Sequence, residues 1–232
     1  MDHQVIVAEW RKRPESIDEA ARRIVQTCEG LSAIDRRFLG DWHITRKRFE
    51  RFDTSSPALE KYLKRTRPRN DIGELIPVGH RFSLISGSDT SYSVTMTLSF
   101  GSTTRLPIVR PNSCRLEIPD NAETSSILSR DGLISIVRAL VVAWEPDVCL
   151  VFPLAWWKSK NYRVSASWLT YCAASVGGVE DVFAGCRRVE VDALGTIFVA
   201  MEDRFEPTIE SHQALVLSLD EKAKRTVLNA DP

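Results

Sequence analysis

The chain has 232 residues, of which 43% are apolar and 27% charged, and its formal net charge at neutral pH is zero. This length and composition predict one folded, soluble domain over residues 1–232. The neutral total argues against a protein that binds polyanions with its whole surface. The five cysteines form no CxxC pair and several lie in apolar runs, so we expect reduced, structural thiols: Cys28, Cys114, Cys149, Cys172 and Cys186.

The sequence shows neither a secretory signal nor a membrane-spanning segment. The apolar run that begins at Val5 is too short for a signal peptide. No uncharged run approaches the roughly 18 residues that a membrane span needs. We therefore expect a cytoplasmic protein with no membrane partner.

The N-terminal part of the chain predicts a strand and two helices. Val5–Trp10 is typical of a strand, and Ser16 and Glu19 have the spacing of a capping box at the start of an amphipathic helix. Gly30 is predicted to end this helix. A second helix is predicted at residues 58–66, after a Ser-Pro pair that suits a helix start.

The middle of the chain predicts an antiparallel sheet. Residues 81–86 and 92–100 alternate between apolar and polar side chains, which is typical of a hairpin with one wet face. Residues 87–90 would form its turn. A loop or bulged edge is predicted at 101–111, and a further strand at 113–118.

The longest apolar stretch, residues 132–144, predicts a helix that is buried on most of its faces. Ser129 is the expected N-cap of this helix, and Pro146 is expected to end it. Strands are predicted on either side of a connection, at 147–152 and 164–172.

The chain becomes acidic toward its C-terminus. Residues 188–191 and 196–202 predict a hairpin, and a final helix is predicted at 211–227. Its expected apolar stripe is Leu215, Leu219, Ala223 and Val227. Together the elements predict an α+β fold: a mostly antiparallel sheet with helices packed against it, and one largely buried helix at about 130–145.

The sequence contains no familiar catalytic or metal-binding motif. Its four histidines are far apart, and none has a partner at metal-ligand spacing. A Walker loop, a Gly-x-Gly-x-x-Gly loop and a Gly-x-Ser-x-Gly elbow are all missing from the sequence. We therefore predict no catalytic residue, no metal and no cofactor.

Two segments of opposite charge each allow two interpretations. Residues 36–69 hold eleven Lys/Arg and four Asp/Glu, and this stretch could follow a nucleic-acid backbone or form a solvated face over an ordinary core. Residues 179–221 hold ten Asp/Glu and three Lys/Arg. Among these acids, Glu202, Asp203, Glu206 and Glu210 could form a hydrolase carboxylate cluster or a solvated rim. The solvated alternative is favoured in both segments, and for the acids the reason is that no basic or nucleophilic companion stands nearby.

The tryptophans divide into two groups. We expect Trp42, Trp144 and Trp168 to be structural core residues. Trp156 and Trp157 are adjacent, and adjacent strand residues face opposite sides of a sheet. At least one of these two rings is therefore expected to be exposed if both lie in a strand.

Short motifs follow one another in a set order over residues 5–175. After the first helix comes Ile34-Asp-x-x-Phe38-x-x-x-Trp42. It is followed by Phe82–Gly87, Leu98–Gly101, Asn112–Pro119, the apolar helix to Trp144-Glu-Pro146, and Ser167–Tyr171. This order resembles that of bacterial polymorphic-toxin immunity proteins, in particular the family numbered fifty-two.

The resemblance implies a cytosolic antitoxin that is not an enzyme. Such proteins are encoded beside an effector secreted by a type VI or similar system, and they bind and neutralise this toxin. The toxins of the family are typically nucleases with a restriction-endonuclease-like fold, so the antitoxin would block the active site or substrate access. From the residues alone, the alternative is a nucleic-acid-binding or regulatory module that uses residues 36–69.

A nuclease presents a basic groove, so the acidic region at 179–228 is expected to face the toxin. Edge strands of the predicted sheet also permit a homodimer. The candidate toxin-binding residues are the acids Glu180, Asp181, Glu202, Asp203, Glu206 and Glu210, with Trp156, Trp157 and Tyr162 as anchors.

Overall fold

The computed structural model of the chain describes residues 2–44, 50–66, 72, 79–86, 93–102, 112–162 and 164–228. The predicted turn at 87–90 and most of the predicted loop at 101–111 lie outside these residues. The helices are α1 (Ile17–Ile34), α2 (Arg36–Leu39), α3 (Ser56–Thr66), α4 (Arg130–Trp144), α5 (Leu154–Ser159), α6 (Val179–Val182) and α7 (Glu210–Leu228). The strands are β1 (His3–Trp10), β2 (Trp42–Ile44), β3 (Glu50–Arg51), β4 (His80–Ser86), β5 (Val94–Phe100), β6 (Asn112–Pro119), β7 (Val148–Pro153), β8 (Leu169–Ala173), β9 (Arg187–Val191) and β10 (Gly195–Val199).

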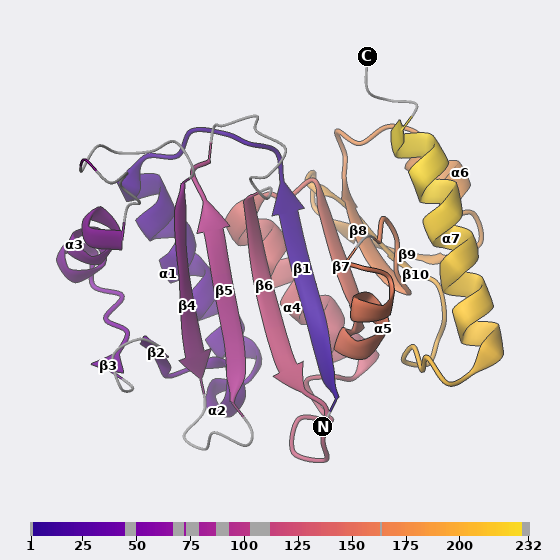
Figure 1. The fold of residues 1–232 in the computed structure, drawn as a ribbon, viewed down its shortest axis with the longest axis horizontal. Coiled ribbons are helices and arrows are strands. Elements are labelled where there is room, and N and C mark those ends of the chain that lie inside the picture. The colour runs from indigo at the N-terminus through magenta and orange to yellow at the C-terminus, as the bar shows by residue number, and fades with distance from the viewer. Residues whose placement is uncertain are drawn as a thin grey trace.

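These strands form one antiparallel sheet in the order β3-β2-β4-β5-β6-β1-β7-β8-β10-β9 (Figure 1). β1 lies between β6 and β7, and its residues Val5–Ala8 are buried on both faces of the sheet. The predicted α+β class with a mostly antiparallel sheet is confirmed. The strands predicted at 5–10, 81–86, 92–100, 113–118 and 147–152 are confirmed to within two residues at each end.

The strand predicted at 164–172 is wrong in its first half, because β8 begins only at Leu169. The Oδ1 atom of Asp220, from α7, accepts hydrogen bonds from the amides of Ser165 and Ala166 at 2.5 and 3.3 Å. Amides that donate to a side chain are not available to a neighbouring strand. The alternation of small and large side chains in this segment therefore belongs to a loop tied to α7.

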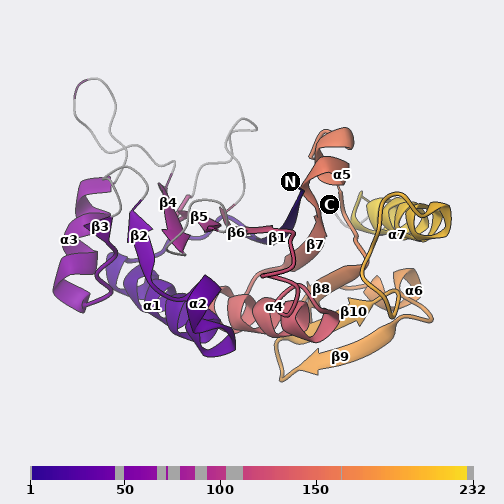
Figure 2. The ribbon, with the colours of Figure 1, turned by 90° about the horizontal axis from the view of Figure 1, so that it is seen from below.

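Two helices, α1 and α4, cover one face of the sheet (Figure 2). At the start of α1, Ser16 Oγ accepts from the Glu19 amide at 3.1 Å and the Glu19 carboxylate accepts from the Ser16 amide at 2.9 Å, which confirms the predicted capping box. The predicted end at Gly30 is wrong, because the helix continues to Ile34. Gly30 serves close packing instead, since a Cβ there would lie 3.2 Å from the Cβ of Ala139 in α4.

The helix α4 is the largely buried helix that the sequence predicted. Ser129 caps it by accepting a hydrogen bond from the Gly132 amide at 3.1 Å, and the helix ends before Glu145, whose φ of 45° is left-handed. The sheet curves so that β8, β10 and β9 lie along this helix (Figure 2), and Arg138 donates to the Glu190 carbonyl at 3.2 Å. The buried residues of α4 are Leu133, Ile134, Ile136, Val137, Leu140, Val141, Ala143 and Trp144.

The helices α5 and α7 lie on the opposite face of the sheet (Figure 2). The hairpin predicted around residues 192–195 is confirmed as β9 and β10, and the final helix as α7. The apolar stripe of α7 is displaced from the prediction, because Leu215 is 38% exposed whereas Val216, Leu219 and Ala223 are buried. None of the helices in the described part of the chain combines the length and apolar character that crossing a membrane requires.

Candidate functional site

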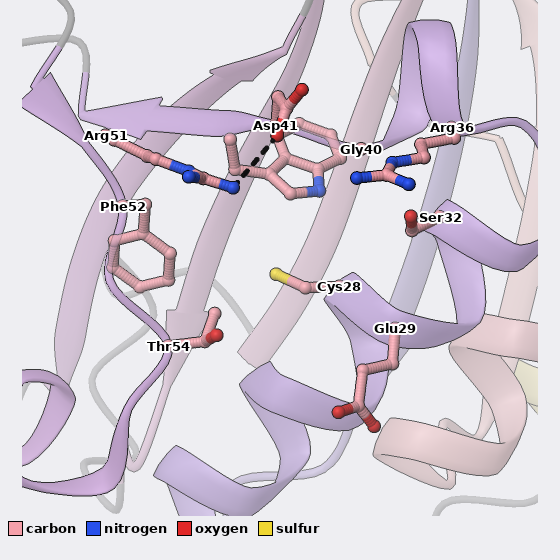
Figure 3. Close-up of a pocket in the computed structure, with 10 residues that line it drawn as sticks. Cys28, Glu29, Ser32, Arg36, Gly40, Asp41, Arg51, Phe52 and Thr54 are labelled. Atoms are coloured by element: carbon pink, nitrogen blue, oxygen red, sulfur yellow. Dashed lines mark hydrogen bonds and ion pairs between the residues drawn. The ribbon is translucent and has the colours of Figure 1, made fainter.

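A pocket of about 390 Å³ opens between α1, α2 and the short strands β2 and β3 (Figure 3). Arg36 and Arg51 extend toward it from opposite sides, and Asp41 lies beside Arg51. Glu29 points away from the two guanidinium groups, at the other end of the pocket. The fold therefore brings together two cations that the sequence separates by fifteen positions.

The single turn of α2 places Arg36 at this pocket. The Asp35 side chain caps the turn by accepting from the amides of Arg37 and Phe38 at 2.9 and 3.1 Å. Phe38 and Leu39 are buried against the core, so the other side of the turn faces outward. Arg36 lies on this outward side and is exposed.

Some polar groups of the pocket have an ion-pair or hydrogen-bond partner within the protein, and others do not. Arg51 Nη2 lies 3.2 Å from Asp41 Oδ1, in a pair whose side chains are 77% and 62% exposed. Within the described ranges, Arg36 has no ion pair. Trp42 also lines the pocket and is 5% exposed, and its buried indole N–H has no hydrogen-bond partner among the described residues. The pocket thus offers more hydrogen-bond donors than the protein itself uses.

The pocket continues into a second hollow along α1. Glu29 and Thr54 line both hollows, and the second, of about 730 Å³, lies between α1 and α3. Asp18, Arg22 and Glu60 contribute charges to its walls. Together the two hollows form a polar groove that follows the outer side of α1.

The predicted anchor residues form an aromatic group around α5. Trp156 and Trp157 are only 5% and 9% exposed, and they do not lie in a strand, which was the condition for expecting an exposed indole. Both residues belong to the short helix α5, in which adjacent residues need not face opposite sides. Both rings pack on Phe152, with ring centres 6.5 Å away for Trp156 and 4.9 Å for Trp157. Tyr162 is 51% exposed, and its ring stands edge-on to Trp157 at 4.8 Å.

The exposed ring of Tyr162 is held in a fixed position. Asn161 and Tyr162 both have left-handed backbones, with φ of 51° and 61°, a conformation that is uncommon outside glycine. The Tyr162 amide donates to the Trp157 carbonyl at 3.1 Å. On the other side, the guanidinium of Arg115 lies 4.6 Å from the centre of the Trp157 ring. Buried aromatic contacts thus support one exposed phenol.

The acidic loop between β10 and α7 is joined to this aromatic group. Phe205, in the loop, is buried and lies edge-on to Trp156 with ring centres 5.4 Å apart. Glu202 forms an ion pair with Arg130. In the described part of the chain, the other three acids of this region have no ion pair. We call the exposed residues Tyr162, Glu202, Asp203, Glu206 and Glu210 the aromatic–acidic surface.

Glu180 and Asp181 lie elsewhere. They belong to α6, where Val182 packs with Ala223 in the second half of α7. Glu180 forms an ion pair with Arg188. Since an α-helix rises about 1.5 Å per residue, the start and this part of α7 are roughly 20 Å apart. The structure therefore divides the predicted acidic residues into two groups.

The tryptophans predicted to be structural are buried. Trp144 and Trp168 are fully buried, and Trp42 is 5% exposed. Trp144 stacks on Trp10 with ring centres 4.8 Å apart, and its Nε1 donates to Thr27 Oγ1 at 2.8 Å. These contacts connect β1, α1 and α4.

The basic stretch at 36–69 is described only in part. Five of its eleven Lys/Arg residues, three at 46–48 and two at 67–69, lie outside the described residues. Among the basic residues that the structure does describe, Arg37, Arg51 and Lys64 each form an ion pair with a carboxylate. These three residues therefore do not form a basic surface without neighbouring acids.

The cysteines are free thiols, and four of the five are buried. Burial raises the pKa of the Cys28 and Cys172 thiols to about 12 and that of Cys114 well above its ordinary value. Thiols of this kind are protonated, and therefore unreactive, at neutral pH. Among the described residues, no group of three or more His, Cys, Asp or Glu is arranged to hold a metal ion.

The groove residues Arg36, Asp41, Trp42 and Arg51 were not predicted as a site. In the sequence, the arginines are two among eleven cations of one segment, and no spacing rule sets them apart. The sequence Gly40-Asp41-Trp42, among many charged residues, does predict a turn at this place. It does not predict which side chains come together across that turn.

The sequence model of the family described as Immunity protein 52 matches residues 5–229. Among solved structures, the chain is similar to the Pseudomonas aeruginosa T6SS protein PA0821, with a TM-score of 0.57 and 10% identity over 97% of this chain and 73% of that one. An identity this low shows a shared fold alone. The curated proteins include none that matches the chain. The family match covers nearly the whole chain and reaches beyond the motifs at residues 5–175, and the chain belongs to the immunity protein 52 family.

Proposed function

We propose that this protein neutralises a cognate toxin by binding it, and that it catalyses no reaction itself. The family match over residues 5–229 is the observation that carries this proposal. The toxin is the product of a neighbouring gene and is delivered by a type VI or similar system, as the T6SS name of the structural neighbour suggests. The free cysteines suit a reducing cytosol as the place of action.

We further propose that the toxin is a nuclease and that its basic groove meets the aromatic–acidic surface. Three exposed carboxylates there, Asp203, Glu206 and Glu210, have no ion pair among the described residues. Unpaired acids attract a basic partner at long range and so raise the association rate. Tyr162 supplies the aromatic anchor, and the buried Trp157 supports its ring from below. Trp156 packs on Phe205 and does not touch the toxin either.

A titration of the full chain with the product of the neighbouring gene, at low and high salt, tests this proposal. The triple variant D203N/E206Q/E210Q is expected to slow association roughly tenfold at low salt and to reduce the salt dependence. The control D181N/E221Q changes one exposed acid of α6 and one in the second half of α7, away from this surface, and is expected to associate normally. An unchanged rate in the triple variant would exclude the acidic loop as the contact.

Replacement of the anchor tests the other half of the surface. Tyr162→Ala is expected to raise the dissociation rate about thirtyfold, as the loss of an interface hot spot does. Tyr162→Phe keeps the ring and is the control. Inhibition of toxin activity by the native chain tests the class of function. Turnover of a substrate by the chain alone, abolished by one polar substitution, would contradict it.

A further inference from the structure

We propose that the pocket between α1, α2, β2 and β3 is a binding site for a carboxylate, and that an Asp or Glu side chain of the partner toxin occupies it. The identity of the partner, a toxin, is taken from the proposed function, and this inference rests on it. It does not rest on the aromatic–acidic surface, which is built around α5 and the start of α7 on the opposite face of the sheet from α1 (Figure 2). The pocket would add a basic contact with the toxin to the acidic one proposed above.

The first argument is the arrangement of the two arginines. Arg36 comes from α2 and Arg51 from β3, and both guanidinium groups reach toward the same hollow (Figure 3). Like charges that converge repel one another, and an anion between them removes this repulsion. Asp41 lies beside Arg51 and neutralises that side only. Glu29, the other acid of the lining, points away at the far end of the pocket, so the end that holds the two arginines and Asp41 keeps one uncompensated positive charge.

The second argument is the indole N–H of Trp42. The side chain lines the pocket and is 95% buried, and its Nε1 has no acceptor among the described residues. Buried donors are nearly always paired in folded proteins, so an unpaired one calls for an explanation. The indole N–H groups of Trp10 and Trp168 are also unpaired in the described part of the chain, but of these three residues only Trp42 lines the pocket, where an anion can act as its acceptor. Ser32 and Thr54 add hydroxyl groups to the same lining. Apart from Asp41 and the distant Glu29, the site presents donors.

The third argument concerns the kind of anion. A carboxylate is planar and accepts two parallel hydrogen bonds from a guanidinium group. It carries one negative charge, which matches the uncompensated positive charge. A phosphate approaches two negative charges at neutral pH and would face additional repulsion from Asp41. The hollow also continues along α1 through Glu29 and Thr54, and a groove of this length suits a chain segment better than a free ion.

The site can be tested without the toxin, with sodium acetate as the probe. The six tryptophans give separate indole N–H signals in a nitrogen-15 NMR spectrum, and Trp42→Phe identifies the one from Trp42. At constant ionic strength, acetate is expected to shift this signal in a saturable manner. The shift is expected to vanish in R36Q/R51Q. Both arginines are exposed, so these substitutions do not endanger folding.

Arg37→Gln is the matched control for this titration. Arg37 is the neighbour of Arg36 in α2, but it pairs with Glu123 at 2.7 Å and does not line the pocket. This variant is expected to keep the acetate response. No saturable shift, or a shift that persists in R36Q/R51Q, would overturn the site. A response to inorganic phosphate but not to acetate would overturn its assignment to a carboxylate.

The toxin is the probe of the second experiment. With the product of the neighbouring gene, R36Q/R51Q is expected to lower affinity at least tenfold relative to Arg37→Gln. If the native chain binds and the double variant binds equally well, the pocket inference is wrong and the proposed function stands. If the native chain fails to bind, the proposed function is wrong, and the acetate titration still decides whether the pocket holds a carboxylate.

Discussion

The two faces of the sheet are built in different ways. On one face, α1 and α4 bury a continuous apolar core that includes Ile24, Leu140 and Trp144. On the other face, Trp156, Trp157 and Val216 extend this core through the sheet. There α6 and α7 also share a smaller, separate cluster with β8 and β10, in which the ring centres of Phe183 and Phe198 are 4.5 Å apart. The first face is thus covered by one apolar core, and the second is divided between an extension of that core and a separate cluster.

Polar bonds take a larger part on the second face. Asp220 is 3% exposed, accepts from the amides of Ser165 and Ala166, and pairs with Lys224 at 2.5 Å. Over β4 and β5, the same face carries hydroxyl side chains such as Ser83 and Thr97, 3.0 Å apart. The difference teaches that the α1–α4 face sets stability, while the second face is free to carry Tyr162 and the acidic loop. The following substitutions test this division.

The largest effect is expected at Trp144, the last residue of α4, in the core of the first face. Its ring is fully buried, stacks on Trp10 and donates to Thr27. Trp144→Ala removes this burial and leaves a cavity, so the free energy of unfolding should fall by about 3–5 kcal/mol in urea denaturation. Val142→Ala, on the exposed side of the same helix, is the control and should change it by no more than about 0.5 kcal/mol. Equal losses in the two variants would contradict the division.

The second effect belongs to the other face. Asp220→Ala leaves the amides of Ser165 and Ala166 without their acceptor and should cost about 2–4 kcal/mol. Hydrogen exchange should then quicken in α7 and around residues 165–168, while α1 and α4 keep their protection. Asp220→Asn retains an acceptor oxygen and should lose less. Uniform loss of protection across both faces would show that they unfold as one unit.

A smaller effect is expected where α1 and α4 touch. A Cβ at Gly30 meets the Cβ of Ala139 at 3.2 Å, so Gly30→Val overpacks the contact and should cost about 1–3 kcal/mol. In Gly30→Ala, the gain in helix propensity of about 1 kcal/mol offsets the tight contact. The unfolding free energy of this second variant should therefore stay near that of the native chain. A Gly30→Val variant as stable as the native chain would show that the helices separate easily.

The sequence predicted most of the elements because their signals are local. The capping box at Ser16 and the alternation in β4 to β6 depend on residues close together in the chain. The errors arose where a distant residue decides the outcome. Gly30 continues a helix because α4 lies against it, and residues 164–168 leave the sheet because Asp220 binds their amides.

The candidate sites were less predictable than the fold. The acidic residues of the C-terminal region formed one group in the sequence, but α7 separates Glu180 and Asp181 from the loop at 202–206. Trp156 and Trp157 were predicted as contacts and are buried, while Tyr162 is exposed. Arg36 and Arg51 line the same pocket only because the chain turns between α2 and β2. Surface sites depend on which distant side chains converge, and periodicity does not carry this information.

The smallest effect concerns how the free energy of unfolding decreases as the pH falls into the acid range. Hydrogen bonds from the amide and hydroxyl of Ser16 lower the pKa of Glu19 from its ordinary 4.5, the amide bond contributing most. The folded state thus binds this proton more weakly than the unfolded state does. The resulting stabilisation is complete above the unfolded-state pKa and is lost as the pH falls from 4.5 through the lower folded-state pKa.

Glu19→Gln removes this titration but keeps a side-chain acceptor for Ser16. The urea midpoint of the variant should therefore fall less steeply than that of the native chain between about pH 5 and pH 3. Glu29→Gln, on the same helix, removes one carboxylate without touching the capping box and is the control for the change of charge. A Glu19→Gln variant with the full native slope would show that the start of α1 does not contribute to the acid limb.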